Sequence, residues 1–171
     1  MPLHLIIDGY NLIRQSPELQ GMEAGGLEAG REALLSRLAA YRQTRSPGKI
    51  TVVFDGWQGG GLRESRDRYR GIIIVYSRRG ERADEVIKRL LAQERERAVV
   101  VSSDREIQTW AAQVGAAWVA AASFEMLYLN HPEGAAPDEA DEPGAARARK
   151  KGPARRLPKQ QRRRQHRLKK L

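Results

Sequence analysis

His4-Leu5-Ile6-Ile7-Asp8 is a short apolar run that ends on a carboxylate, and Ala98-Val99-Val100-Val101-Ser102-Ser103-Asp104 repeats the pattern later in the chain. Two further runs, 50–54 and 72–76, are also apolar at every position or nearly so, and a weaker run covers 116–119. Runs of this length without polar alternation predict strands that are buried on both faces, as in a parallel sheet. These five runs therefore predict the central sheet of the protein.

The segments between the expected strands show helical spacing of apolar residues. Where strands alternate with helices, right-handed crossovers place helices on both faces of the sheet. We therefore expect an α/β fold in three layers, with a central, mostly parallel sheet of about five strands. The glycine-rich stretch 56–61 and the polar run 62–70 predict a loop. The expected helices cover 27–41, 84–97, 106–114 and 123–129.

Composition limits the possible classes of protein. The chain has 171 residues, of which 40% are hydrophobic, enough for one core. It contains no cysteine, which excludes disulfides and thiolate metal sites. No apolar run approaches the ~20 residues of a membrane helix, and the first residues lack the cationic start of a secretory signal. We therefore expect a soluble, cytoplasmic protein.

Positive charge is concentrated in the last part of the chain. Residues 145–171 hold 13 of the 31 Lys and Arg and no acid, so residues 1–144 retain 18 bases against all 21 acids. The formal net charge of +10 thus belongs to the tail. We expect a folded domain over 1–130, an acidic Pro/Gly-rich linker over 131–144, and a basic, disordered tail over 145–171.

Carboxylates follow the expected strands at one edge of the sheet. Asp8 and Asp55 come directly after the first two strands, Asp104 follows the fourth, and Asp84 begins the helix after the third. α/β proteins bind ligands at this carboxyl edge. Gathered carboxylates repel one another unless a cation lies between them, and Mg²⁺ and Mn²⁺ prefer oxygen ligands. The sequence therefore predicts a Mg²⁺ or Mn²⁺ site suited to phosphodiester hydrolysis.

Each of these acids also has a purely structural interpretation. Asp8 and Asp55 are each followed by glycine, a common turn dipeptide, while Asp84 and Asp104 suit helix N-termini. Taken singly, each acid is better explained as a turn or a cap. Their joint placement after successive strands is what favours a functional site.

Three polar residues accompany the acids. Asn11 lies three residues after Asp8, where its amide could hold a metal-bound water or a phosphate oxygen, or simply start a helix. Ser102 and Ser103 could contact the aspartates or the substrate phosphate, or only solvate the strand end. We include all three in the candidate site.

Other catalytic arrangements have little support. The three histidines, His4, His131 and His166, fall on a strand, in the linker and in the tail, which does not favour a histidine metal site or a histidine base. Gly59-Gly60-Gly61 lacks the Lys-Ser/Thr continuation of a phosphate-binding P-loop.

Four segments resemble the YacP-like NYN-domain family and occur in the family's order over about the first three-quarters of the chain. The glycine-rich stretch 56–61 departs from that pattern, and the basic tail lies outside it. The four segments are Leu5-Ile6-Ile7-Asp8-Gly9-Tyr10-Asn11-Leu12-Ile13, Val52-Val53-Phe54-Asp55-Gly56, Arg82-Ala83-Asp84-Glu85-Val86-Ile87, and Val100-Val101-Ser102-Ser103-Asp104-Arg105-Glu106-Ile107-Gln108.

The resemblance implies a PIN-like (NYN) fold and a metal-dependent endoribonuclease, in a family linked to ribosome-associated mRNA cleavage. Carried over residue by residue, it implies an acidic metal centre of Asp8, Asp84 and Asp104. Asn11 matches the family's asparagine after the first strand. Asp55 matches its acid after the second strand, either as a metal ligand or as a wall of the pocket.

Arginines gather around the third expected strand. Arg66, Arg79 and Arg82 are candidates for binding the phosphates of a substrate, and Trp57 and Tyr69 for stacking on its unpaired bases. An equally good alternative is a solvated loop with scattered surface charges. The basic tail is expected to bind polyanions such as ribosomal RNA without sequence preference, the alternative being a solubilising extension.

Our leading hypothesis is a metal-dependent endoribonuclease that cleaves single-stranded RNA. Two alternatives share the same fold: a non-catalytic RNA-binding or ribosome-associated module, and a nuclease directed at DNA. The preference for RNA rests mainly on the family resemblance.

Overall fold

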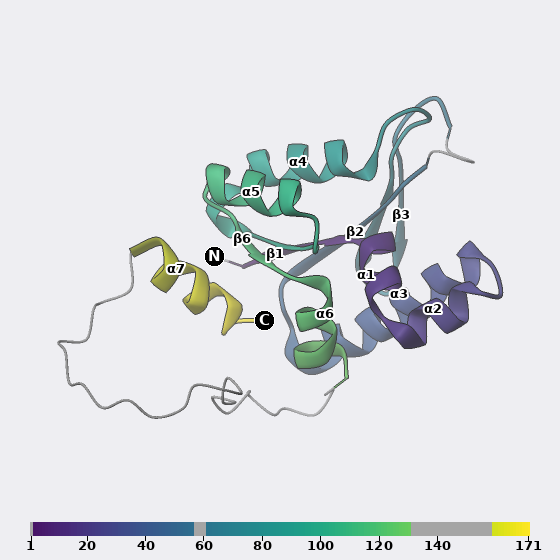
Figure 1. The fold of residues 1–171 in the computed structure, drawn as a ribbon, viewed down its shortest axis with the longest axis horizontal. Coiled ribbons are helices and arrows are strands. Elements are labelled where there is room, and N and C mark those ends of the chain that lie inside the picture. The colour runs from purple at the N-terminus through teal and green to yellow at the C-terminus, as the bar shows by residue number, and fades with distance from the viewer. Residues whose placement is uncertain (1, 57–60, 131–158) are drawn as a thin grey trace, which may run out of the picture.

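The computed structural model describes residues 2–56, 61–130 and 159–171, and its centre is one six-stranded sheet (Figure 1). The strands lie in the order β3-β4-β2-β1-β5-β6, and all neighbours are parallel except β3 and β4, which are antiparallel. The strands are β1 (His4–Asp8), β2 (Lys49–Phe54), β3 (Ser65–Tyr69), β4 (Ile72–Tyr76), β5 (Ala98–Val101) and β6 (Ala117–Val119).

Helices cover both faces of the sheet, which confirms the expected three-layer α/β fold. The central strands are apolar on both sides because each face packs against helices, and Ile6 and Ile7, which point to opposite faces, are both fully buried. On one face lie α1 (Gly9–Gln15), α2 (Pro17–Glu23), α3 (Leu27–Arg45), α6 (Ala121–Phe124) and η2 (Glu125–Leu129), and on the other α4 (Ala83–Glu94), η1 (Arg95–Arg97) and α5 (Arg105–Val114).

The sixth strand comes from the polar run that we expected to be a loop, so that interpretation is wrong for Ser65–Tyr69. β3 has no apolar face because it is an edge strand and its pairing with β4 depends on main-chain hydrogen bonds. Arg70 and Gly71 both have positive φ, as a two-residue hairpin turn requires. Backbone pairing of this kind leaves no hydrophobic pattern in the sequence.

Two helices were missing from the sequence interpretation. α1 begins directly after β1, and α2 follows it with Ser16 as N-cap and Pro17 in the first turn. Ser-Pro at a helix start is a recognisable signal, since the serine side chain accepts the Leu19 N–H and proline needs no N–H partner there. The two helices are only seven residues each, too short to show a clear helical period.

The tail also differs from expectation, because Lys159–Leu168 forms helix α7 rather than a disordered segment. α7 lies beside β6, and Leu171 beyond it is buried against the core beneath α3 and η2. Tyr41 and Tyr128 donate hydrogen bonds from their hydroxyls to the main-chain oxygens of Leu171 (2.6 Å) and Leu168 (3.0 Å). The expected linker, 131–144, and the first part of the tail, 145–158, lie outside the described residues.

In the part of the chain that the structure describes, no helix is long and apolar enough to cross a membrane.

Candidate active site

The sheet reverses its strand order between β1 and β5. From β1 the chain moves outward through β2 to β4 and β3, and then returns to β5 on the other side of β1. In an open parallel sheet, the loops at such a reversal diverge and leave a crevice at the carboxyl ends of the two strands. Asp8 and Ser102 stand at those two ends, so the topology places them at the crevice.

A cavity of about 570 Å³ occupies this crevice and contains all four predicted metal-binding acids. Asp8, Asp55, Asp84 and Asp104 line it, and so do Asn11 and Arg82. The structure thus brings together six candidate residues from four separate segments. Sequence reasoning did not single out the other lining residues, which are Tyr10, Arg14, Gln15, Leu27 and Ala83.

Asp8 is the most buried acid of the cavity, with 8% of its surface exposed. Burial is the main reason that the pKa of Asp8 is raised from 3.8 to about 6, and the negative charges of Asp84 and Asp104 add to the shift. Hydrogen bonds from the Asn11 backbone and the Ser102 side chain oppose it. Burial also raises the pKa of Asp84, an effect that Asp104 increases and Arg82 opposes. The carboxylates therefore repel one another across a poorly solvated space.

Ser102 and Ser103 fix the loop between β5 and α5. The Ser102 hydroxyl donates to Asp8 Oδ2 (3.2 Å) and accepts the Asp104 backbone N–H (3.1 Å). The Ser103 backbone N–H donates to Asn11 Oδ1 (2.9 Å), and its hydroxyl accepts the Ala121 N–H (3.1 Å). In this structure both serines contact protein groups around the acids, so they position Asp8, Asn11 and Asp104.

Asp104 has two roles in its structural setting. Its Oδ1 accepts the backbone N–H groups of Glu106 (2.7 Å) and Ile107 (3.4 Å), which makes it the N-cap of α5. It also lines the acid cavity. The two interpretations that the sequence left open, cap and site residue, are therefore compatible.

Gly9 allows α1 to begin close to β2. A Cβ at Gly9 would lie 2.3 Å from the Phe54 ring, so a side chain here would force α1 away from the sheet. The close approach brings the Tyr10 ring edge-on to Phe54, with 5.2 Å between the ring centroids. Tyr10 is thereby held at the cavity wall, next to Asp8 and Asn11.

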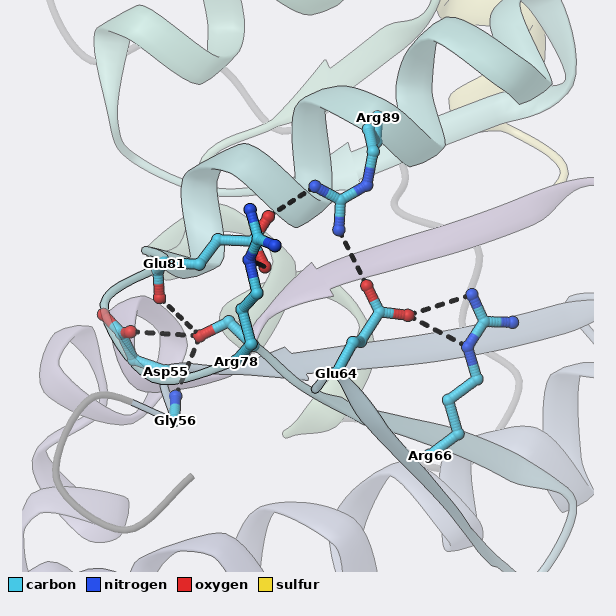
Figure 2. Close-up of polar contacts among 8 residues, drawn as sticks. Asp55, Gly56, Glu64, Arg66, Arg78, Glu81 and Arg89 are labelled. Carbon is cyan, nitrogen blue, oxygen red and sulfur yellow. Dashed lines mark hydrogen bonds and ion pairs between the residues drawn. The ribbon is translucent and has the colours of Figure 1, made fainter. Parts of the chain in front are cut away.

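Asp55 lies at the other side of the cavity in a separate polar network, which Figure 2 shows. The Ser77 hydroxyl accepts the Gly56 N–H (2.9 Å) and lies 2.7 Å from the carbonyl of Glu81 and 3.3 Å from Asp55 Oδ1. A hydroxyl carries one hydrogen, and the shorter contact favours Glu81 as its acceptor. Ser77 therefore ties the end of β2 to the loop before α4 and leaves Asp55 weakly held.

The three predicted phosphate-binding arginines lie in different places. Arg82 lines the cavity and pairs with Asp84 at 3.2 Å. Arg66 is on β3 and pairs with Glu64, which is bridged by Arg89 to Glu81 (Figure 2). Arg79 is exposed and, like Arg66, does not line the acid cavity. Trp57 lies outside the described residues.

The donor chemistry of the cavity suits a hydrated divalent cation. Within residues 2–56, 61–130 and 159–171, no three His, Asp or Glu side chains stand close enough to form a ready-made metal cage. Mg²⁺ retains several waters and is commonly held by one or two carboxylates, so it does not need such a cage. Burial first, and neighbouring carboxylates second, raise the pKa of Asp8 and of Asp84, and a bound cation would favour the charged form of both.

Known proteins resemble this chain in sequence and in fold. YacP of Bacillus subtilis (strain 168), an uncharacterized protein, is 33% identical over 86 residues, which are 50% of this chain and 49% of YacP. The match thus spans about half the length of that relative. The crystal structure of Rae1 (YacP) from Bacillus subtilis aligns over 71% of this chain and 70% of its own, with 30% identity and a TM-score of 0.56.

A mutant of Rae1 (YacP) from the same organism aligns with a TM-score of 0.58 and 25% identity, over 70% of both chains. The family model of the YacP-like NYN domain matches residues 5–170, which include all four acids and helix α7. This family is nuclease-like, and NYN and PIN-like nucleases generally depend on divalent metals. The chain belongs to the YacP-like NYN domain family.

Proposed function

We propose that this protein is a metal-dependent endoribonuclease that cleaves single-stranded RNA in the acid cavity. The observation that carries the proposal is the meeting of Asp8, Asp84 and Asp104 in one cavity at the switch point of the sheet, with Asp8 buried and its pKa raised. Family membership supports a nuclease-type function and suggests RNA as its substrate.

The proposed roles follow from position. Asp8, Asp84 and Asp104 would hold Mg²⁺ or Mn²⁺, with Asp55 across the cavity as a further ligand or a wall. Such an ion activates water and stabilises the leaving oxygen in phosphodiester hydrolysis. Asn11, held by Ser103, presents its amide at the same wall.

Phosphate binding is assigned to the cations nearest the acids. Arg82 and Arg14 line the cavity and would attract the phosphates that the carboxylates repel. Arg66 and Arg79 lie outside it and would contact the strand farther from the cleaved bond. Ser102 and Ser103 would act through the residues they position.

Beyond the cavity, we propose mRNA as the substrate, cleavage in association with the ribosome, and a cytoplasmic location. The basic region 145–171 would add non-specific contacts to RNA, which weaken steeply as salt rises. The nuclease domain would cover 1–130, with 131–144 as the linker to the basic region.

The decisive experiment is a cleavage assay with the purified full chain on single-stranded RNA, in Mg²⁺, in Mn²⁺ and in EDTA. We expect cleavage only with a divalent cation, and a loss of at least about a thousandfold in Asp8→Asn, because the buried carboxylate charge is removed. Glu18→Gln, at an exposed residue that does not line this cavity, is the control.

Two further substrates separate the alternatives. A circular RNA has no ends, so its cleavage identifies an endonuclease, and a DNA of the same sequence tests for a DNA-directed enzyme. Wild-type protein that binds RNA but never cuts it would favour the non-catalytic module. Unchanged cleavage by Asp8→Asn would refute the role assigned to Asp8.

A further inference from the structure

A second cavity, of about 540 Å³, lies between α3 and the β3–β4 hairpin. It is on the sheet face that α3 covers, beside the half-buried rings of Tyr69 and Tyr76. Three carboxylates line it as well: Glu28 and Glu32, one turn apart on α3, and Asp67 on β3. The cavity therefore combines flat aromatic surfaces with hydrogen-bond acceptors.

Arg31 and Tyr10 connect this second cavity to the acid cavity. Arg31 lines the second cavity, and its Nη1 donates a hydrogen bond to the hydroxyl of Tyr10 (2.8 Å), which lines the first. The Arg31 guanidinium also lies 5.8 Å from the centre of the Tyr76 ring. Tyr10 and Tyr76 both pack on Phe54, so the walls of the two cavities share one aromatic row.

The carboxylates of the second cavity favour the base of a nucleotide over its phosphate. Carboxylates repel a phosphate but accept hydrogen bonds from the N–H groups of a base. No hydrogen bond or ion pair joins Glu28 or Glu32 to another described residue, although Arg31 and Arg68 line the same cavity and the charge of Glu28 acts on Arg31. Asp67 Oδ1 accepts the Arg68 backbone N–H (2.7 Å), which leaves Asp67 partly engaged. The two glutamates are thus the principal acceptors.

We propose that the second cavity binds the base of a nucleotide next to the cleaved linkage, and that it prefers guanine. This inference rests on the proposed function, since it assumes that an RNA strand occupies the acid cavity. Single-stranded RNA is commonly recognised by stacking a base on aromatic or arginine side chains and by hydrogen bonds to its Watson–Crick edge. The Arg31 guanidinium, which lies over the Tyr76 ring, and the neighbouring Tyr69 ring supply the stacking surface, and Glu28 and Glu32 the acceptors.

Guanine fits these acceptors best because its Watson–Crick edge presents two adjacent donors, N1–H and N2–H, to one carboxylate. Cytosine and adenine each offer only an amino group there. Uracil offers a single N–H between two carbonyl oxygens, which the carboxylates repel. The cavity should therefore rank guanine first and uracil last.

The test compares two short labelled RNAs, one of uridines only and one with a single guanosine among the uridines. Binding to the full chain is measured by fluorescence anisotropy in EDTA, and cleavage positions are mapped in Mn²⁺. We expect the guanosine to tighten binding about tenfold and to direct cleavage to one adjacent linkage, since one good two-point contact discriminates by about that much. An abasic residue in place of the guanosine should abolish the gain.

The variant that probes the cavity is the double change Glu28→Gln and Glu32→Gln, which keeps two good helix formers on the surface of α3. It should lose most of the preference for guanosine while it binds the uridine-only RNA at least as tightly as wild type. Glu18→Gln makes the same kind of change at one glutamate of α2, outside the cavity, and should keep the preference. Circular dichroism melting checks that each variant is folded.

The outcomes separate this inference from the proposed function. Cleavage without any base preference, or a preference that the double variant retains, overturns the guanine site while the nuclease function stands. Guanosine-selective binding in EDTA that disappears in the double variant supports the base site, even if no RNA is ever cut.

Discussion

The acid cavity and helix α7 each concentrate one sign of charge, at opposite ends of the sheet. The cavity lies at the carboxyl ends of β1 and β5, whereas α7 contacts Glu96 and Gly115, which precede β5 and β6 (Figure 1). In the cavity, the sheet holds like charges near one another and buries Asp8. Such an arrangement costs stability, and it is expected where a ligand supplies the missing charge.

α7 distributes its charges in a different way. The Arg164 guanidinium lies 3.7 Å from the centre of the Trp118 ring, and Arg167 donates to the carbonyls of Gly115 (2.8 Å) and Glu96 (3.0 Å). Burial lowers the pKa of both arginines, and their contacts attach the helix to the body of the protein. The lysines and arginines left exposed in α7 or just after it are Lys159, Arg162, Arg163, Lys169 and Lys170, of which Arg163 pairs with Glu96 (3.2 Å).

A run of like charges in the sequence therefore does not define a single role for its residues. In α7, some basic residues attach the helix to β6, and the exposed ones remain for a polyanion. In the cavity, every acid faces the same space. Substitutions at the two kinds of position should therefore differ in their effect on the free energy of unfolding.

The attachment of α7 should depend most on Leu171, which has 3% of its surface exposed and packs in the core beside Tyr41. Leu171→Ala should lower the free energy of unfolding by about 3 kcal/mol, the usual cost of removing a buried leucine side chain. Urea unfolding of the full chain measures this. Leu62→Ala, at a side chain with 87% exposure, is the control and should change little. If Leu171→Ala left the free energy of unfolding unchanged, the tail would not be docked on the core.

The buried charge of Asp8 should lower the free energy of unfolding, so removing that charge should make the protein more stable. Because the folded pKa of Asp8 is about 6 against a usual 3.8, its folded form binds a proton more tightly than its unfolded form. Its contribution to stability therefore falls as pH rises from 3.8 to about 6, and stays low above that range. Asp8→Asn should raise the free energy of unfolding by about 2 kcal/mol near pH 7.5 in EDTA.

The sign of that effect can be checked by changing pH and metal. Near pH 4 the Asp8 carboxyl is protonated in the folded state, so the advantage of Asp8→Asn should vanish. Mg²⁺ should stabilise the wild type more than the variant. Asp67→Asn, at an exposed position on β3, is the matched control and should show neither effect. A loss of stability in Asp8→Asn near pH 7.5 would contradict this account.

The smallest effects should separate the attached from the exposed arginines. Arg164→Ala should cost about 1 kcal/mol, because the stacking on Trp118 is lost. Arg162→Ala, at an exposed position, should change the free energy of unfolding by less than about 0.5 kcal/mol. It should reduce the slope of log RNA affinity against log salt concentration by about one. Unfolding curves and RNA titrations over a salt series measure both. If both variants lowered the free energy of unfolding equally, the division between attached and exposed arginines would be wrong.

The central fold could be predicted from the sequence because its signals are local. Strands β1, β2, β4 and β5 are largely apolar, and the acids that follow them mark the edge of the candidate site. The sequence did not predict β3, because its pairing with β4 uses the backbone. It did not predict α7 either, because the attachment of this helix depends on Tyr41, Trp118 and Tyr128, which are distant in the sequence. The sequence allowed Ser102 and Ser103 to contact the aspartates, the substrate phosphate or only solvent, and the contacts of the folded chain place both serines against the residues of the cavity.

By itself, the sequence determined the α/β class, the parallel strands and the four carboxylates at one edge, because strand burial and strand ends are properties of contiguous residues. Only the tertiary structure decided how these residues act together. It collected Asp8, Asp55, Asp84 and Asp104 in one cavity, linked that cavity through Arg31 to a second one, and divided the basic residues of α7 between packing and solvent. The physical reason is that desolvation, mutual repulsion and stacking depend on distances between segments, which strand order and helix packing set.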